Sequence, residues 1–463
     1  MDFFSLMKVA ALAATIFSEE MPDFLEDPTL KRGVDIRRAE GADAAFQYFS
    51  KAAQAGDVAA VYALGVLYES GEGPPASVAE AERYYRAAAN AGYARAQSKL
   101  GMLLLTKAGS PELGGEAKKD AQRKEGFEWL GRAAEGGSAR AMRTLGKLYY
   151  TGVGLEKDDA AAWRWFRRAA AAEDAAAAYH VGLMIEGGRV PEGEAESAGE
   201  AKAWYLRAAA EGLGEAMLKL ATLAKVEGAE ADAVVWLEKA AAANHPLAAV
   251  QLSAMYYSGT GGVGKDIARA GALLESAAKM GYAPAYISLA KFYAKDDNDA
   301  ARQMAAEWLG KGAARGSAEC LVALGDFYLG DEGREGIGKG EPDYGKAAGP
   351  FLKAAAAGHP EAFYQLGRFY EHGLGTEANL KKAGAQYQFA AQRGHPDAQA
   401  CLARFFAEGI GCEKDLVRAY AMSFNAKEAS PLAKELADKL AGQLSPAQLA
   451  EAKAQVAKAR NRE

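Results

Sequence analysis

The stretch Leu64-Gly65-Val66-Leu67-Tyr68 recurs along the chain and decides the fold class. Close copies are Leu145-Gly146-Lys147-Leu148-Tyr149 and Leu366-Gly367-Arg368-Phe369-Tyr370. With the glycine as anchor, equivalent positions recur at spacings of 32 to 45 residues. A repeat of about this length is typical of solenoids built from helix pairs. The ten anchors are Gly65, Gly101, Gly146, Gly182, Ala221, Ser253, Ala290, Gly325, Gly367 and Ala403.

The residues around each anchor keep a fixed register. Five residues before it stands alanine in nine copies and Cys320 in the tenth, and one residue before it stands leucine in nine copies and Val181 in the tenth. Together with an often aromatic residue three places after the anchor, these positions share one face of a helix. The block therefore predicts the first helix of each pair. In the second helix, one aromatic slot holds five of the six tryptophans, which we expect to pack in the core between layers.

Residues that favour helix ends stand where this register places them. Left-handed glycines are expected to end second helices, prolines to begin the next first helix, and aspartates to cap second helices. These residues are, in turn, Gly92, Gly281 and Gly358; Pro246, Pro360 and Pro396; and Asp158, Asp266 and Asp415.

The full pattern is Ala-x-x-x-Leu-Gly-x-x-Tyr-x-x-Gly-x-Gly…Lys-Asp…Ala-x-x-Trp-[Phe/Tyr]-x-x-Ala-Ala-x-x-Gly. It resembles the Sel-1-like repeat, a relative of the tetratricopeptide repeat, over roughly residues 41 to 428. The copies around Ala221 and Ala290 lack the Gly-x-Gly loop. The resemblance implies an all-α fold, a right-handed α/α superhelical solenoid of about ten helix–turn–helix repeats. It also implies a scaffold or adaptor that holds other proteins, often in bacteria.

Three parts follow from this register: an N-terminal segment over 1–40, the repeat solenoid over 41–428, and C-terminal capping helices over 429–463. Ser445 to Gln448 reads as a capping box that starts the last helix. Two interpretations of the N-terminal segment remain open. Leu12 to Phe17 resembles a degenerate first helix, which favours the cytoplasm. The apolar run from Val9 to Phe17 also resembles the core of a signal peptide, which implies export.

Three insertions interrupt the repeats, at Thr106 to Gly126, Glu186 to Gly199, and Gly330 to Gly345. Insertions between the two helices of a pair emerge on one rim of a solenoid. They are either surface loops or contacts for a specific partner.

The charge balance argues against nucleic acid and lipid as general partners. The chain has 55 Lys and Arg against 61 Asp and Glu, a net charge of −6. A mildly acidic chain binds polyanions poorly, and no apolar stretch reaches the ~18 residues of a membrane span. Three cysteines do not make a disulfide scaffold, and Cys320 is expected to be a packed thiol.

No constellation of residues predicts a catalytic, cofactor or metal site. Gly259 to Asp266 imitates a phosphate-binding loop, but it follows a helical register and lacks the hydroxyl residue for Mg²⁺. His245, His359 and His395 precede prolines at repeat junctions and lack further ligands at zinc spacing. We therefore expect a non-catalytic protein. An enzyme, or a small-ligand or metal binder, built on the solenoid is the alternative.

The candidate partner site is the exposed face of the first helices. Positions three before and one after the anchor point away from the predicted core stripe, and they carry tyrosines and basic residues, types that are common in binding hot spots. In related helical-repeat proteins the first helix lines the concave face. A solvated face without a partner is the alternative. The predicted binding residues are Tyr62, Arg143, Lys147, Tyr179, Lys291, Tyr364, Arg368 and Arg404.

Overall fold

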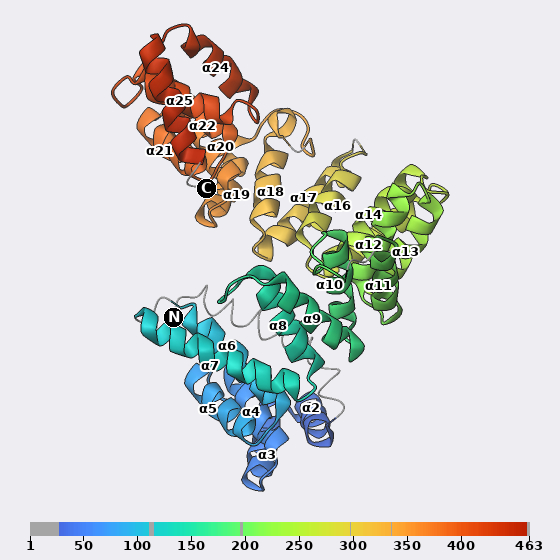
Figure 1. Cartoon of the computed structure of the whole chain (residues 1–463). Helices are drawn as coiled ribbons and strands as arrows, with labels where there is room; N and C mark the ends of the chain where they lie inside the picture. The colour runs from blue at the N-terminus through green and yellow to red at the C-terminus, as the bar shows by residue number, and fades with distance from the viewer. Residues whose placement is uncertain (1–26, 111–114, 195–197, 297, 335, 461–463) are drawn as a thin grey trace. The chain divides into compact units, whose positions relative to one another are not determined.

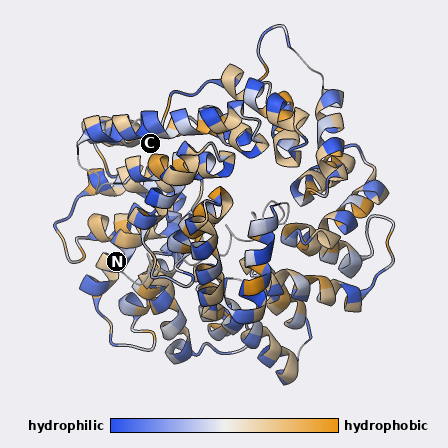
Figure 2. Ribbon diagram, turned by 90° about the horizontal axis from the view of Figure 1, so that it is seen from below, coloured by the Kyte–Doolittle hydropathy of each residue, from blue (hydrophilic) through white to orange (hydrophobic). Residues whose placement is uncertain are grey.

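The computed structural model describes residues 27–110, 115–194, 198–296, 298–334 and 336–460. Over these residues the chain forms 24 α-helices, one short 3-10 helix and no strand (Figure 1). Apolar and polar residues share the same helices throughout (Figure 2), as expected where each helix buries one side. The all-α solenoid predicted from the repeats is confirmed.

The chain divides into two compact units, Met1–Leu220 and Ala221–Glu463. The boundary falls within α12 (Gly214–Val226). The other helices of the first unit are α2 (Pro28–Glu40), α3 (Ala42–Gln54), α4 (Val58–Ser70), α5 (Val78–Asn90), α6 (Ala94–Ala108), α7 (Glu116–Glu135), α8 (Ala139–Thr151), α9 (Asp159–Ala171), α10 (Ala175–Glu186) and α11 (Ala198–Ala210).

The second unit continues the alternation of first and second helices. Its helices are α13 (Glu230–Ala242), α14 (Pro246–Ser258), α15 (Ile267–Lys279), α16 (Ala283–Tyr293), α17 (Asp299–Ala314), α18 (Ala318–Tyr328), α19 (Tyr344–Ala356), α20 (Pro360–His372), α21 (Leu380–Gln392), α22 (Pro396–Glu408), α23 (Leu416–Ala426), α24 (Pro431–Ala441) and α25 (Pro446–Arg460).

The anchor glycines let an aromatic ring of the second helix lie directly on the first helix. A Cβ atom added to Gly325 would lie 2.6 Å from Cζ of Phe351, and one added to Gly367 would lie 2.5 Å from Cε1 of Tyr387. Both rings are completely buried. Because real Cβ atoms do not approach a ring so closely, glycine is required at these anchors while the ring is present.

The predicted helix-end signals are present. Gly92, Gly281 and Gly358 all have left-handed backbones with φ of 84° to 85°. The side chains of Asp158, Asp266 and Asp415 accept hydrogen bonds from the third residue of the following helix. Pro246, Pro360 and Pro396 begin α14, α20 and α22.

Two repeats place other residues at the left-handed position. Glu173 has a φ of 63° and Asn244 a φ of 59°. The backbone conformation is therefore kept where the glycine is lost, because the turn into the next first helix requires it.

The first described helix precedes the predicted solenoid boundary. The degenerate helix expected at Leu12 to Phe17 lies outside the described residues. Within the described part of the N-terminal segment, α2 packs against α3, with Gly33 of α2 directly below the Phe49 ring. The pair α2–α3 thus repeats the glycine–aromatic contact of the later pairs.

The last two helices pack on the end of the second unit. Side chains from α23, α24 and α25, among them Tyr420, Leu440 and Val456, share one buried cluster. The capping box at the start of α25 is present: the Ser445 amide donates to Gln448 over 3.0 Å, and the Gln448 amide donates to the Ser445 hydroxyl over 3.3 Å. The division at residues 40 and 428 stays a prediction.

Two of the insertions are more ordered than surface loops need to be. The first is partly helical, because α7 extends over 20 residues from Glu116. In the third, Ile337 is 2% exposed and packs in a cluster with Ala290 and Leu309 of α16 and α17. The loop is therefore held down by its own apolar side chain.

Candidate functional site

The candidate site lies on the first helices α4, α8, α10, α16, α20 and α22, and the structure separates its residues into three groups. Lys147 and Lys291 have exposed side chains. Arg143, Arg368 and Arg404 are half-buried and paired. The three tyrosines lie where consecutive repeats meet. Whether these residues bind a partner stays a prediction.

The expectation that Tyr62 faces solvent is wrong. Its side chain is only 2% exposed, because its ring packs between the ring of Tyr85, 5.8 Å away, and that of Tyr93, 5.4 Å away. Tyr85 belongs to the second helix of the same repeat, and Tyr93 precedes the next first helix. The position three residues before the anchor is therefore covered by the following repeat.

Tyr179 and Tyr364 occupy the same position and are half-buried. The Tyr179 ring lies 5.6 Å from that of Tyr205, and the Tyr364 ring stacks on the imidazole of His395 at 4.6 Å. Burial raises the pKa of Tyr364 to about 12, so its hydroxyl remains a neutral donor at physiological pH.

Two of the three predicted arginines, Arg143 and Arg404, connect repeats. The guanidinium of Arg143 pairs with Asp174 over 3.0 Å, and Asp174 caps the first helix of the next repeat. The guanidinium of Arg404 pairs with Glu371 of the preceding first helix. Arg368 donates to the side-chain amide oxygen of Gln365 over 3.0 Å. These arginines already have structural partners, so a ligand must share or replace those contacts.

Tyrosine–glutamate–cation bridges recur at the repeat junctions, and sequence reasoning did not identify them. The Tyr205 hydroxyl donates to Glu186 over 2.7 Å, and Lys219 of the next first helix reaches the same carboxylate over 2.8 Å. The same arrangement joins Tyr85, Glu69 and Lys99, and also Tyr387, Glu371 and Arg404. The signal was a glutamate four residues after those anchors whose second helix carries tyrosine.

Burial and pairing compete at these carboxylates. Burial opposes ionisation of Glu186, but the hydrogen bonds from Lys219 and Tyr205 outweigh it, and its pKa lies below the usual value. Burial raises the pKa of Tyr205 and Tyr387, and the neighbouring carboxylates add to the shift. The tyrosines therefore act as fixed neutral donors.

The three junction histidines are the residues before α14, α20 and α22. The Nδ1 atom of His395 accepts from the Ala398 amide over 3.2 Å, and its Nε2 lies 2.9 Å from Glu361. His245 caps α14 in the same way. Over the described residues, His, Cys, Asp and Glu side chains do not gather in threes that are able to hold a metal ion.

The segment from Gly259 to Asp266 joins α14 to α15. A phosphate-binding loop of the kind that this segment imitates follows a strand, whereas this segment follows a helix. Asp266 caps α15, accepting from the Arg269 amide over 2.9 Å. The segment is the loop of a repeat.

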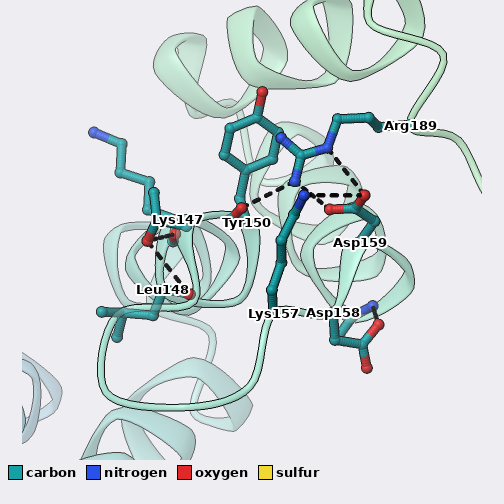
Figure 3. Close-up of polar contacts among 9 residues, drawn as sticks. Lys147, Leu148, Tyr150, Lys157, Asp158, Asp159 and Arg189 are labelled. Atoms are coloured by element: carbon teal, nitrogen blue, oxygen red, sulfur yellow. Dashed lines mark hydrogen bonds and ion pairs between the residues drawn. The ribbon is translucent and has the colours of Figure 1, made fainter. Parts of the chain in front are cut away.

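The first part of the Glu186–Gly199 insertion, residues 186–194, folds back on the preceding pair. The guanidinium of Arg189 lies 3.6 Å from the centre of the Tyr150 ring and donates to the Tyr150 carbonyl over 2.9 Å (Figure 3). It also pairs with Asp159, with Nε at 3.0 Å from the carboxylate. Arg189 therefore connects this part of the insertion to α8 and α9.

The tryptophan slot is not a purely apolar core position. Trp129 is buried, but Trp165, Trp204, Trp236 and Trp308 are half-buried. A basic residue three positions later covers each ring, at 4.5 Å for Arg132 on Trp129 and 4.6 Å for Arg168 on Trp165. Residues three apart on a helix are neighbours, so Trp-x-x-Arg or Trp-x-x-Lys was the signal.

The model of the Sel1 repeat matches ten stretches that together cover more than half of the chain. They are residues 32–57, 58–93, 94–138, 139–174, 175–213, 215–245, 246–282, 318–359, 360–395 and 396–422.

The chain belongs to the Sel1 repeat family. Nine of the predicted repeats coincide with these Sel1 repeats, and the stretch 32–57 adds one that the anchor count omitted. The predicted repeat around Ala290 falls in 283–317, which the Sel1 model does not match, although α16 and α17 form a helix pair there.

Similar proteins carry names of regulation and binding. The chitin synthase regulator SKT5 of Saccharomyces cerevisiae is 33% identical over 157 residues, which are 32% of this chain and 22% of that protein. The DAP3-binding cell death enhancer 1 of Mus musculus is 40% identical over 186 residues, 40% of this chain and 34% of that protein. The chain thus spans about a quarter to a third of the length of these curated relatives.

Solved Sel1-type structures are similar over most of the chain. A protective antigen of uropathogenic Escherichia coli with an SLR fold has 24% identity and a TM-score of 0.45, covering 89% of this chain and 93% of that one. A Sel1 repeat protein from Oxalobacter formigenes has 28% identity and a TM-score of 0.44, covering 70% and 89%. Over the residues described here, no helix has the length and apolar character to span a membrane.

Proposed function

We propose that this Sel1 repeat protein is a non-catalytic scaffold or adaptor that binds a peptide or protein segment along the first helices of its repeats. Sel1 repeats typically mediate protein–protein interaction. The named relatives are a regulator and a binding protein rather than enzymes. The partner is a protein rather than a nucleic acid, in keeping with the net charge of −6.

The observation that carries this proposal is the placement of Lys147 and Lys291. Each follows the anchor directly, and each side chain is exposed on its first helix. In the first unit, Arg143 lies one turn before Lys147 on α8 and pairs with Asp174, which caps the next first helix, α10. The half-buried Tyr179 lies on α10. In this proposal the exposed lysines contact the partner, and the half-buried arginines, which also keep the repeats in register, share their contacts with it.

Site-specific photo-crosslinking tests this proposal. A benzoylphenylalanine is placed at Lys147 or Lys291 in the native cell, and matched controls replace Lys239 or Lys311 on second helices. We expect the same protein adduct from both first-helix positions and none from the controls. Adducts from the controls alone would move the binding site to the second helices.

Purified partner then tests the half-buried arginines. Arg368→Glu combined with Arg404→Gln is expected to weaken binding at least tenfold, whereas Lys311→Glu leaves it unchanged. Circular dichroism verifies that each variant is folded, because Arg404 also pairs with Glu371. Unchanged binding by the double variant would remove Arg368 and Arg404 from the site.

A further inference from the structure

A second surface, on the second helices α7 and α9 of the first unit, carries arginines stacked on tryptophans. The guanidinium of Arg132 lies over Trp129 in α7, and that of Arg168 lies over Trp165 in α9. Stacking holds a guanidinium by its face, so its N–H groups point sideways in the plane of the group. They remain available for a planar acceptor.

Arg168, one of these stacked arginines, already binds a planar acceptor, a carboxylate. Arg168 donates through both terminal nitrogens to the two oxygens of Glu135, the last residue of α7, each over 3.0 Å. Both side chains are well exposed, at 45% and 65%. A carboxylate therefore already occupies the edge of a stacked guanidinium on this surface, in the bidentate geometry that arginine favours.

One helical turn earlier, the same two helices present two arginines. Arg132 precedes Glu135 by three residues, so the two lie on the same face of α7. Arg164 precedes Arg168 by four residues, so these two lie on the same face of α9. Because each repeat is a helical hairpin, α7 and α9 run in the same direction, and the two residues face the same side. Both are exposed.

No carboxylate of the described residues pairs with either arginine. Glu135 is engaged by Arg168 through both oxygens. Glu128, one turn before Arg132, is exposed and lies beyond ion-pair distance. The surrounding stretch 116–168 has twelve Lys and Arg against eight Asp and Glu, although the whole chain is acidic. Two like charges on neighbouring helices favour an anion between them.

We propose that Arg132 and Arg164 form a docking site for acidic side chains of an extended segment of a partner protein. The carboxylate on Arg168 indicates the chemistry, and the exposed part of the half-buried Trp165 ring supplies apolar contact area. Successive second helices pack about 10 Å apart, which an extended chain spans in about three residues. Acidic residues at every third position match this spacing. The surface is separate from the first-helix face.

Fluorescence anisotropy with a labelled (Glu-Pro-Pro)5 peptide tests the proposal. A polyproline II chain rises about 3.1 Å per residue with three residues per turn, which aligns its glutamates on one side about 9 Å apart. We expect saturable binding to the full chain and at least tenfold weaker binding to Arg132→Glu/Arg164→Glu. Glu135→Gln, which releases Arg168, is expected to strengthen binding about threefold, a gain that damage to the fold does not produce.

The matched control is Lys239→Glu/Lys311→Glu, which reverses the equivalent cations, stacked on Trp236 and Trp308, in the second unit. Unchanged binding by this control supports the site. Equal binding of (Gln-Pro-Pro)5, equal loss in the control variant, or no loss in Arg132→Glu/Arg164→Glu would overturn it. Stronger competition by oligothymidine or by phosphatidylserine vesicles than by free peptide would also overturn it, in favour of a general polyanion surface. None of these results bears on the first-helix proposal, whose variants lie on other helices.

Discussion

Two neighbouring repeats of the second unit build the same helix pair from different residues. In α18–α19, Gly325 lies against the ring of Phe351. In α16–α17, Ala290 and Leu309 are both fully buried in one cluster. The Sel1 model matches 318–359 but not 283–317. Glycine with phenylalanine and alanine with leucine have similar combined volumes, so either pair can fill this contact.

The glycine–aromatic pair and the alanine–leucine pair differ in their contacts with the next repeat. The Phe351 ring meets that of Phe369 in the following first helix at 5.8 Å, and the Tyr387 ring meets that of Phe405 at 5.7 Å. The Phe166 ring stacks on His180 at 4.7 Å. An aromatic residue in this slot therefore joins the packing within a repeat to the packing between repeats.

The largest effect is expected from Gly325→Ala. The new methyl group would overlap the Phe351 ring, 2.6 Å from Cζ, and the buried ring has no free space to move into. We expect a loss of about 3 kcal/mol in the free energy of unfolding, measured by urea denaturation with circular dichroism.

The double variant Gly325→Ala/Phe351→Leu copies the residues of the neighbouring repeat. It is expected to recover more than half of that loss, because leucine leaves room for the methyl group. If it is as unstable as Gly325→Ala alone, the two repeats are not equivalent solutions of one packing problem.

Removal of a single hydroxyl tests the tyrosine–glutamate–cation bridge. Tyr387→Phe keeps the ring but takes away the hydrogen bond to Glu371, which is 2.7 Å long. A hydrogen bond to a charged group contributes about 1.5 kcal/mol or more. We expect a loss of about 1.5 kcal/mol in the same denaturation assay. An unchanged free energy of unfolding in Tyr387→Phe would mean that this hydrogen bond does not stabilise the repeat.

Stability should depend on pH through His180. Burial, followed by the positive charges of Lys147 and Arg143, lowers the pKa of this imidazole from 6.5 to about 4. Between those values the unfolded chain binds a proton that the folded chain does not. Stability therefore falls as the pH decreases from 6.5 towards 4, by about 1 kcal/mol between pH 7 and pH 5 once solvent screening is allowed for.

The difference between the wild type and His180→Phe, measured at both pH values, isolates this contribution. The phenylalanine keeps the stacking on Phe166 and does not titrate. The variant is expected to lose about 1 kcal/mol less than the wild type on acidification. Identical pH slopes for the two proteins would mean that His180 is protonated in the folded state as readily as in the unfolded chain.

The smallest effect is expected from Ala290→Gly. In a helix interior, glycine is about 1 kcal/mol less favourable than alanine. Leu309 leaves space for the methyl group of Ala290. Removal of this methyl group therefore relieves no steric overlap that could compensate for the loss. We expect a loss of about 1 kcal/mol. A gain in stability would show that the methyl group of Ala290 overlaps its neighbours. A methyl group added to a glycine anchor such as Gly325 would cause the same kind of overlap.

Local signals predicted the fold in detail. The register of Leu64 to Tyr68, the aspartate caps and the prolines of first turns act within a few residues, and all were found where expected. The repeat around Ala290 was also recognised from its register, in a stretch that the Sel1 model does not match.

Contacts between repeats were harder to predict. Helical periodicity placed Tyr62 on the outside of an isolated helix, but the following repeat covers that side. The carboxylates of Glu69, Glu186 and Glu371 depend on a tyrosine 16 to 19 residues away in sequence. The binding role of the first-helix residues stays a prediction, because binding depends on a second molecule.

The contact between Gly325 and Phe351 makes the order of evolutionary change matter. A repeat that moves from this pair to alanine and leucine passes through one of two intermediates. Shortening the ring first leaves a void, which the surrounding side chains partly fill. Adding the methyl group first produces an overlap in a filled core. Such repeats should therefore diverge by losing the ring before the glycine, so the intermediates of this route carry a glycine anchor opposite a shorter apolar side chain.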